Sequence, residues 1–153
     1  MIDRFSHFRG DDKVKKNKKK IILLLILLII ILFLVAYAII FVYPYSKYNV
    51  GSTHTLERFY QAFTEKDYGE ISELMENGNP QPIITTRQLY GDIEDFKILY
   101  CYNHGQNRKK VRIQIRASRN DTQYKNYDTV LMIKKEGNWV VRSYHSNVEY
   151  VLP

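Results

Sequence analysis

The hydrophobic residues divide the chain into two regions. Residues 21–43 (IILLLILLIIILFLVAYAIIFVY) form an unbroken apolar run of 23 residues without charge, proline or glycine. As a helix this run is about 35 Å long at a rise of 1.5 Å per residue, enough to cross a hydrocarbon core of about 30 Å. A helix that is apolar on every face is typical of a membrane span. The pattern therefore predicts a transmembrane helix over residues 21–43.

After a linker over residues 44–51, the spacing becomes that of amphipathic helices. Ser52 or Thr53 is expected to cap the first helix through its hydroxyl. The apolar positions of this helix follow the i, i+3, i+4, i+7 pattern: Leu56, Phe59, Tyr60 and Phe63. Asp67 is expected to cap a shorter second helix, which buries three apolar residues and ends at Gly78: Ile71, Leu74 and Met75.

Two prolines, in the sequence NPQP at residues 79–82, disfavour regular structure there. We expect a third short helix to begin at Thr85 or Thr86 and to end near Gly91 and Asp92.

From Glu94 onward, apolar and polar residues alternate as they do in half-buried strands. The first strand carries Phe96, Ile98, Tyr100 and Tyr102 on one face. The clearest alternation follows, with Val111, Ile113, Ile115 and Ala117 on one face and polar residues on the other. Two more strands, over residues 127–134 and 139–145, are joined by a hairpin turn at residues 135–138.

These elements predict an α+β fold, in which the transmembrane helix is followed by helices packed on a curved antiparallel sheet of about four strands. The expected organisation is a basic tail (1–20), a transmembrane helix (21–43), a linker (44–51) and one extracytoplasmic domain (52–153). In its core, Trp139 is expected to be buried with Phe59 and Phe63, where helix and sheet meet.

The charge distribution predicts the orientation of the span. The chain has 23 Lys+Arg and 16 Asp+Glu, a net charge of +7, and much of the excess lies in residues 1–20. Lysines border the apolar run on this side (Lys15, Lys16, Lys18, Lys19 and Lys20). Tyr43, the last residue of the run, and Tyr45, just after it, are expected to be interfacial aromatic anchors. By the positive-inside rule the N-terminus stays in the cytoplasm and the C-terminal domain is exported. The lipid bilayer is thus the first expected partner, and the cell membrane is the expected location.

A cleavable signal peptide is the competing interpretation of residues 13–38. The sequence Ala36-Tyr37-Ala38 has the A-x-A form of a cleavage site. The apolar run nevertheless continues through residues 39–43, where a mature protein would begin with polar residues. We therefore favour an uncleaved, single-pass anchor.

The sequence offers little catalytic chemistry. Its one cysteine, Cys101, cannot form an intramolecular disulfide, and no metal-binding or phosphate-binding motif is present, so we predict no cofactor, no metal and no enzymatic activity. The groups available to an acid–base site are Asp92, Asp95, His104, His145, Tyr60, Tyr100 and Tyr102. Most of these positions are typical of solvated turns and core tyrosines rather than of a catalytic pair.

A basic stripe follows one face of residues 108–119: Arg108, Lys110, Arg112 and Arg116. Such a stripe is a possible interaction face for an acidic protein, a wall-polymer phosphate or DNA. It is more typical of the solvated face of a strand. Nucleic acid is not favoured, because the interleaved residues are aliphatic rather than aromatic.

Two passages resemble the nuclear transport factor 2-like (cystatin-like cone) superfamily. Residues 56–68 (LERFYQAFTEKDY) are similar to its opening helix, and residues 131–141 (LMIKKEGNWVV) are similar to its closing hairpin. With a basic tail and a single anchor, the chain resembles the small scaffold subunits of bacterial type IV secretion and conjugation systems. Similar anchored domains occur in Gram-positive envelope and transfer systems.

The resemblance implies a non-enzymatic scaffold that self-associates into a homo-oligomer and holds other membrane or envelope proteins of a complex. Two alternatives remain open: a tethered ligand-binding or enzymatic cone domain, and a wall-polymer or DNA contact through residues 108–119.

Overall fold

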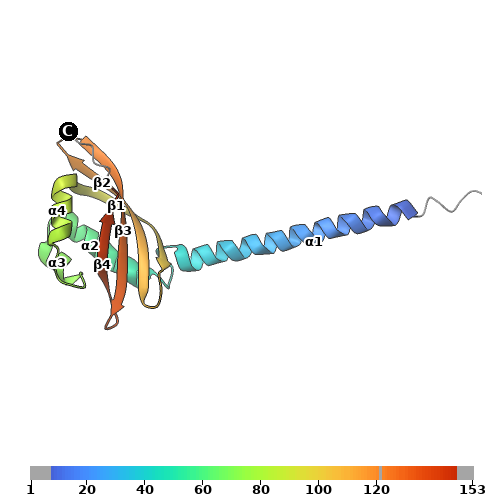
Figure 1. The fold of residues 1–153 in the computed structure, drawn as a ribbon, viewed down its shortest axis with the longest axis horizontal. Helices are drawn as coiled ribbons and strands as arrows, with labels where there is room; N and C mark the ends of the chain where they lie inside the picture. The colour runs from blue at the N-terminus through green and yellow to red at the C-terminus, as the bar shows by residue number, and fades with distance from the viewer. Residues whose placement is uncertain (1–7, 121, 148–153) are drawn as a thin grey trace, which may run out of the picture. The chain divides into compact units, whose positions relative to one another are not determined.

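The computed structural model describes residues 8–120 and 122–147 (Figure 1). The chain forms two compact units, one up to Ala38 and one from Ile39 onward, and each is described by itself.

The first unit is one long helix. Helix α1 spans Phe8–Tyr37 and is followed by a π-helical turn at Ala38–Val42. Residues 17–42 have the length and composition of a membrane span, and within the described residues no other helix does. An apolar helix of this kind fits both a membrane anchor and a signal sequence. The expected apolar helix is thus present, and its topology stays a prediction.

The second unit is a layer of helices on a sheet. Helices α2 (Val50–Glu65), α3 (Tyr68–Glu73) and α4 (Gln81–Tyr90) precede four strands: β1 (Asp92–Asn103), β2 (Arg108–Arg119), β3 (Thr122–Lys135) and β4 (Asn138–Ser146). The strands pair antiparallel in the order β1-β2-β3-β4. The helices cover one face of this curved sheet (Figure 1). The predicted α+β architecture is confirmed.

The core lies between α2 and the sheet, where the sequence pattern placed it. The four apolar positions of α2 are buried, as are the alternating residues of β2: Leu56, Phe59, Tyr60, Phe63, Val111, Ile113, Ile115 and Ala117. Removing a large aliphatic or aromatic side chain from water in this way contributes about 1.5–3 kcal/mol each. Helix α2 is therefore held to the sheet mainly by its apolar stripe.

The start of α2 differs from the prediction, whereas the cap of α3 agrees with it. Helix α2 begins at Val50, so Ser52 and Thr53 do not cap it; their hydroxyls donate to the carbonyls of Asn49 and Pro44, each at 2.7 Å. The cap of α3 is confirmed, because the side chain of Asp67 accepts from the backbone N–H of the first turn.

Helix α4 corrects the interpretation of residues 79–82. It begins at Gln81, directly after Pro80, and Pro82 lies in its first turn. The first helical N–H groups have no intrahelical acceptor, so proline loses nothing there and its fixed φ favours the helix. The prolines therefore start this helix instead of preventing it. Gly91 ends it at φ 96°, close to the predicted end.

Strand β1 changes face halfway along. Its register with β2 shifts between Ile98 and Tyr100, as at a β-bulge. Ile98 and Cys101 are consequently buried, whereas Tyr100 is 40% exposed. The regular alternation expected for this strand was wrong, because one irregular residue reverses the faces of all that follow.

Trp139 is half-buried rather than enclosed by Phe59 and Phe63. Those two phenylalanines pack edge to face at 5.1 Å between ring centroids. Trp139 lies beside Gly51, which precedes Phe59 by about two turns of α2. A Cβ added at Gly51 would be 3.4 Å from the indole ring. The tryptophan therefore covers the start of α2 instead of filling the centre of the core.

Candidate functional site

Asp128 is a carboxylate buried between the helices and the sheet. It lies on the face of β3 that also carries Val130 and Met132, and its side chain is 0% exposed. Burying an ionised carboxylate costs several kcal/mol unless it is paired and hydrogen-bonded. This position therefore needs partners from other elements.

Three donors converge on one oxygen of Asp128. The hydroxyls of Tyr60, from α2, and Tyr144, from β4, donate to Oδ2 at 2.9 and 2.8 Å. Arg87, from α4, donates from Nη2 to the same oxygen at 2.5 Å. Arg87 also donates to the Tyr144 hydroxyl and lies over its ring. These four side chains, here called the Asp128 cluster, connect α2, α4, β3 and β4.

The electrostatics of the cluster keep its phenols protonated. Burial, followed by the charge of Asp128, raises the pKa of Tyr60 and of Tyr144 well above the usual tyrosine value. Burial by itself lowers the pKa of Arg87, but attraction to Tyr144 and Asp128 outweighs it and the net shift is upward. At neutral pH the tyrosines are therefore donors and the guanidinium is charged.

Some polar atoms of the cluster lack a protein partner. Arg87 Nε and Nη1 and Asp128 Oδ1 are buried and form no hydrogen bond within the part of the chain that the structure describes. Buried polar groups are nearly always satisfied by protein or water. These atoms therefore mark where water or a small polar molecule would bind.

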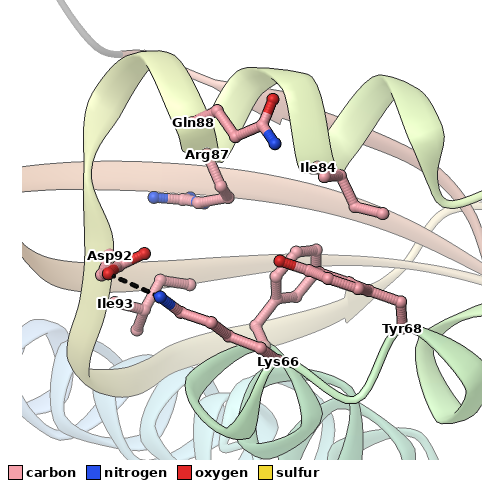
Figure 2. Close-up of a pocket in the computed structure, with 8 residues that line it drawn as sticks. Lys66, Tyr68, Ile84, Arg87, Gln88, Asp92 and Ile93 are labelled. Carbon is pink, nitrogen blue, oxygen red and sulfur yellow. Dashed lines mark hydrogen bonds and ion pairs between the residues drawn. The ribbon is translucent and has the colours of Figure 1, made fainter.

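A small pocket adjoins Arg87 (Figure 2). It is lined by Phe63, Lys66, Tyr68, Ile84, Arg87, Gln88, Asp92 and Ile93 and has a volume of about 30 Å³. Figure 2 shows Lys66 and Asp92 joined across one side of it by an ion pair, with Nζ and Oδ2 2.9 Å apart. Because one water occupies roughly 10–15 Å³ on this measure, the pocket has room for about two or three waters.

The acid–base candidates from the sequence are mostly on the surface. Asp92 and Asp95 are exposed and pair with Lys66 and Arg116. His104 and His145 are exposed, and Tyr100 and Tyr102 stack on each other at 6.0 Å. Among these candidates, only Tyr60 points into the Asp128 cluster.

The basic stripe lies on the outer face of the sheet, opposite the helices. Arg112 donates to Thr129 at 2.6 Å and lies over the Tyr127 ring, and Arg116 pairs with Asp95. Arg108 is exposed and Lys110 is half-buried. Two of the four bases are therefore already engaged, and a role for the stripe as an interaction face stays a prediction.

A second polar cluster surrounds Asn49, just after the apolar segment. Asn49 is fully buried, and its amide donates to the carbonyls of Phe41, Tyr43 and Cys101 at 3.1, 2.9 and 3.3 Å. Its oxygen accepts from Lys109 Nζ at 2.6 Å. The expected linker at residues 44–51 is therefore tied to the domain rather than free.

Lys109 joins this cluster to the rest of the domain. Its ammonium donates to the carbonyl of Tyr48 and lies 5.1 Å from the centre of the Trp139 ring. Burial lowers the pKa of Lys109 and raises that of Cys101. Cys101 is therefore a buried thiol rather than a reactive thiolate.

The residues that flank the span lie at both of its ends. Lys15, Lys16, Lys18, Lys19 and Lys20 belong to α1, and the side chains of the last three are exposed. Tyr43 and Tyr45 are exposed and in edge contact at 5.8 Å. Exposure of these residues is compatible with a membrane interface, which stays a prediction.

Four residues of these two clusters were not predicted from the sequence: Arg87, Asp128, Asn49 and Lys109. A signal was present for two of them: Asp128 shares the inward parity of Val130, and Lys109 shares that of Val111. A charged residue at an inward position of a strand predicts a buried pair, although the alternation does not identify the partner.

Comparison with known proteins identifies the fold. No protein-family model and no curated protein matches the chain. Among solved structures, an NTF-2-like protein of unknown function from Shewanella oneidensis MR-1 matches with a TM-score of 0.50 and 16% identity, over 63% of this chain and 95% of that one. A SEC-C motif-containing protein from Rhodopseudomonas palustris matches with a TM-score of 0.50 and 17% identity, over 60% and 74%.

The second unit has a nuclear transport factor 2-like fold. The likeness extends to the fold alone and does not show catalysis either way. Ligand sites in proteins are usually concave, and here the space between α2 and the curved sheet is the corresponding place (Figure 1). In the nuclear transport factor 2-like domain described here, core side chains and the Asp128 cluster occupy much of that space.

Proposed function

We propose that this protein is a non-enzymatic subunit of a bacterial envelope-spanning assembly. Its apolar helix holds it in the cell membrane with the N-terminus in the cytoplasm, and its exported nuclear transport factor 2-like domain binds partner proteins. The observation that carries the proposal is the packed interior of that domain.

The interior offers little room for a substrate. The pocket beside Arg87 has about 30 Å³, whereas sites for small molecules usually have about 300–1,000 Å³. Asp128 would be the natural general base in such a cone, but its Oδ2 already accepts three hydrogen bonds. A domain packed in this way is better suited to present its surface than to enclose a ligand.

The outer face of the sheet is the surface best suited to a partner. Strand register places Arg112 between Tyr100 and Thr129, and Lys110 between Tyr102 and Leu131. Tyrosine and arginine are enriched in protein interfaces because each combines apolar contact with hydrogen bonding. The predicted interaction face therefore carries tyrosine side chains, of which Tyr100 is exposed, as well as charge.

In its narrower form, the proposal assigns the protein to a conjugative or type IV secretion machine, as a homo-oligomer that contacts other subunits. This assignment is supported by the resemblance of residues 56–68 and 131–141, combined with the single anchor.

Site-specific photo-crosslinking in intact cells tests partner binding. Benzoylphenylalanine replaces Tyr100 on the outer face or, as a control, Tyr68 on the helical side; these tyrosines are 40% and 42% exposed. We expect discrete adducts from position 100 that position 68 does not form. An adduct with the mass of two copies would indicate a homo-oligomer. A protein that forms no adduct from position 100 would contradict the proposal.

A tethered ligand-binding domain is the second candidate, favoured by the unpaired Nε and Nη1 of Arg87 beside the pocket. With Lys66 nearby, the pocket would select a small anion. This candidate predicts that inorganic phosphate or acetate raises the melting temperature, and that Lys66→Met removes the effect. No shift with either anion would exclude it.

A further inference from the structure

The β1–β2 and β3–β4 hairpin turns lie together at one end of the domain, beside the residues that precede α2. This end, made up of residues 43–49, 103–110 and 133–139, is here called the hairpin end. The backbone N–H of Lys134 donates to the carbonyl of Asn107 at 2.9 Å, which joins the two turns. Asn49 donates to the carbonyl of Cys101, and Lys109 donates to that of Tyr48. The residues that follow the apolar segment are therefore part of the same end.

The hairpin end is strongly basic. It contains six basic residues: Lys47, Arg108, Lys109, Lys110, Lys134 and Lys135. Its one acidic residue is Glu136, and none of the six bases forms an ion pair with another described residue. Lys47, Arg108, Lys134 and Lys135 are exposed. Acidic residues gather instead at the opposite end of the sheet and of α2: Glu65, Asp67, Asp92, Glu94 and Asp95.

An apolar groove adjoins these charges. Ile39, Ile40, Tyr43, Ser46, Lys47 and Tyr48 line a groove of about 400 Å³. Within this groove, the ammonium of Lys47 lies 5.1 Å from the centre of the Tyr48 ring. Isoleucine beside tyrosine and lysine is the composition of a membrane interface, where aromatic rings and long cations meet the headgroups.

The chain between the apolar segment and α2 has little slack. Pro44 and Asn49 are buried, and Thr53 donates to the carbonyl of Pro44 at 2.7 Å. If residue 43 lies at the bilayer surface, the hairpin end, which begins at this residue, lies close to the headgroups. A free linker of the same length would allow the domain to turn any face toward the membrane.

We infer that the hairpin end binds the headgroups of anionic phospholipids and docks the domain on the membrane from which it projects. The inference rests on the membrane anchor of the proposed function but not on its protein partners. Among the exposed bases of the hairpin end, only Lys47 is close to the span in sequence. Arg108, Lys134 and Lys135 follow the span by more than 60 residues and reach the membrane only by folding. Because the positive-inside rule counts charges within about 15–20 residues of a span, these bases do not oppose export.

The electrostatic part of this contact is measurable. A basic residue near an anionic surface contributes about 1 kcal/mol, which corresponds to about fivefold in the docking equilibrium. Removing two bases should therefore weaken docking by more than tenfold, and high salt should weaken it further because the charges are exposed.

Headgroup quenching tests the inference with the purified full chain in vesicles. A fluorophore is attached at Gln106→Cys in the hairpin end or at Thr122→Cys at the opposite end; Cys101 is buried and does not compete for the label. The vesicles contain phosphatidylcholine alone or with phosphatidylglycerol, plus a headgroup spin-labelled lipid. We expect stronger quenching at position 106 in the anionic vesicles, reversed by salt, and little change at position 122.

Matched double variants assign the effect to the hairpin end. Lys134→Ser with Lys135→Ser should abolish the additional quenching, whereas Lys97→Ser with Lys125→Ser, also exposed, should leave it intact. The emission of Trp139 confirms that each variant is folded. Equal quenching in neutral and anionic vesicles, or equal loss in both double variants, would overturn the inference. Neither outcome bears on protein partners, because the purified chain has none.

Discussion

Replacing Arg87 with methionine tests whether the Asp128 cluster holds the domain together. The two charged side chains are 7% and 0% exposed, and the paired atoms are 2.5 Å apart. Methionine keeps most of the apolar stem but leaves the Asp128 carboxylate with only the two phenols as donors. Removing one partner of a buried ion pair costs about 3–5 kcal/mol. We expect the free energy of unfolding to fall by that amount, a large share of the 5–15 kcal/mol typical of a domain.

The ion pair between Lys66 and Asp92 is the matched control. Its charged atoms are 2.9 Å apart, but its side chains are 56% and 70% exposed. An exposed pair contributes about 0–1 kcal/mol, because water already solvates both charges. Lys66→Met should therefore leave the free energy of unfolding nearly unchanged.

A double-mutant cycle separates the lost pair from the buried charge that it leaves. Asp128→Asn combined with Arg87→Met leaves no charge in the cluster, so the double variant should be more stable than Arg87→Met alone. Urea unfolding of the full chain in detergent, followed through Trp139, the one tryptophan of the chain, measures all four proteins. The reasoning is refuted if Arg87→Met costs no more than Lys66→Met, or if the two changes at the cluster simply add.

Three further predictions use the same unfolding assay. Burial and the Asp128 charge raise the pKa of Tyr144. The stability that the protonated phenol contributes is therefore complete below the unfolded tyrosine pKa of about 10 and is lost as the pH rises above that value. Tyr144→Phe should accordingly lose less stability at alkaline pH than the native chain. Asn49→Ala should cost about 3 kcal/mol, because it leaves Lys109 without a side-chain acceptor; a change below 1 kcal/mol would contradict the tie to the domain. At Gly91, where φ is +96°, an added Cβ would lie 2.3 Å from a backbone oxygen, whereas at Gly105, where φ is +99°, it would meet open space. Gly105→Ala should therefore cost only the backbone strain of about 1–3 kcal/mol, and Gly91→Ala should cost more. Equal costs for the two variants would refute the clash.

The fold was predictable where a single period continues without interruption. The stripe on α2 and the alternation along β2 identified their buried faces, because burial on one side alone dictates such a pattern. Strand β1 was predicted less well: the bulge after Ile98 moves Cys101 inward, and its cause lies in pairing with β2 rather than in the local sequence. The start of α4 was missed because proline disfavours a helix everywhere except in its first turn.

The polar clusters were not predictable, because their members are far apart in the chain. Arg87 and Asp128 are 41 residues apart, and Asn49 and Lys109 are 60 apart. Asp128 and Lys109 each interrupt an apolar alternation, which indicates burial but does not identify a partner. The acid–base candidates chosen at turns were exposed for the converse reason: polar residues at turns are ordinarily solvated.

The central claim is that the apolar helix remains in the mature protein and holds the domain outside the cell. Intact mass spectrometry of the protein isolated from membranes, before and after protease is added to whole cells, tests it most directly. We expect a membrane-bound chain that retains the residues before Ala38, from which the protease removes the C-terminal domain while the basic tail stays protected. A mature protein that begins at Ile39, or a domain protected in whole cells, would contradict it.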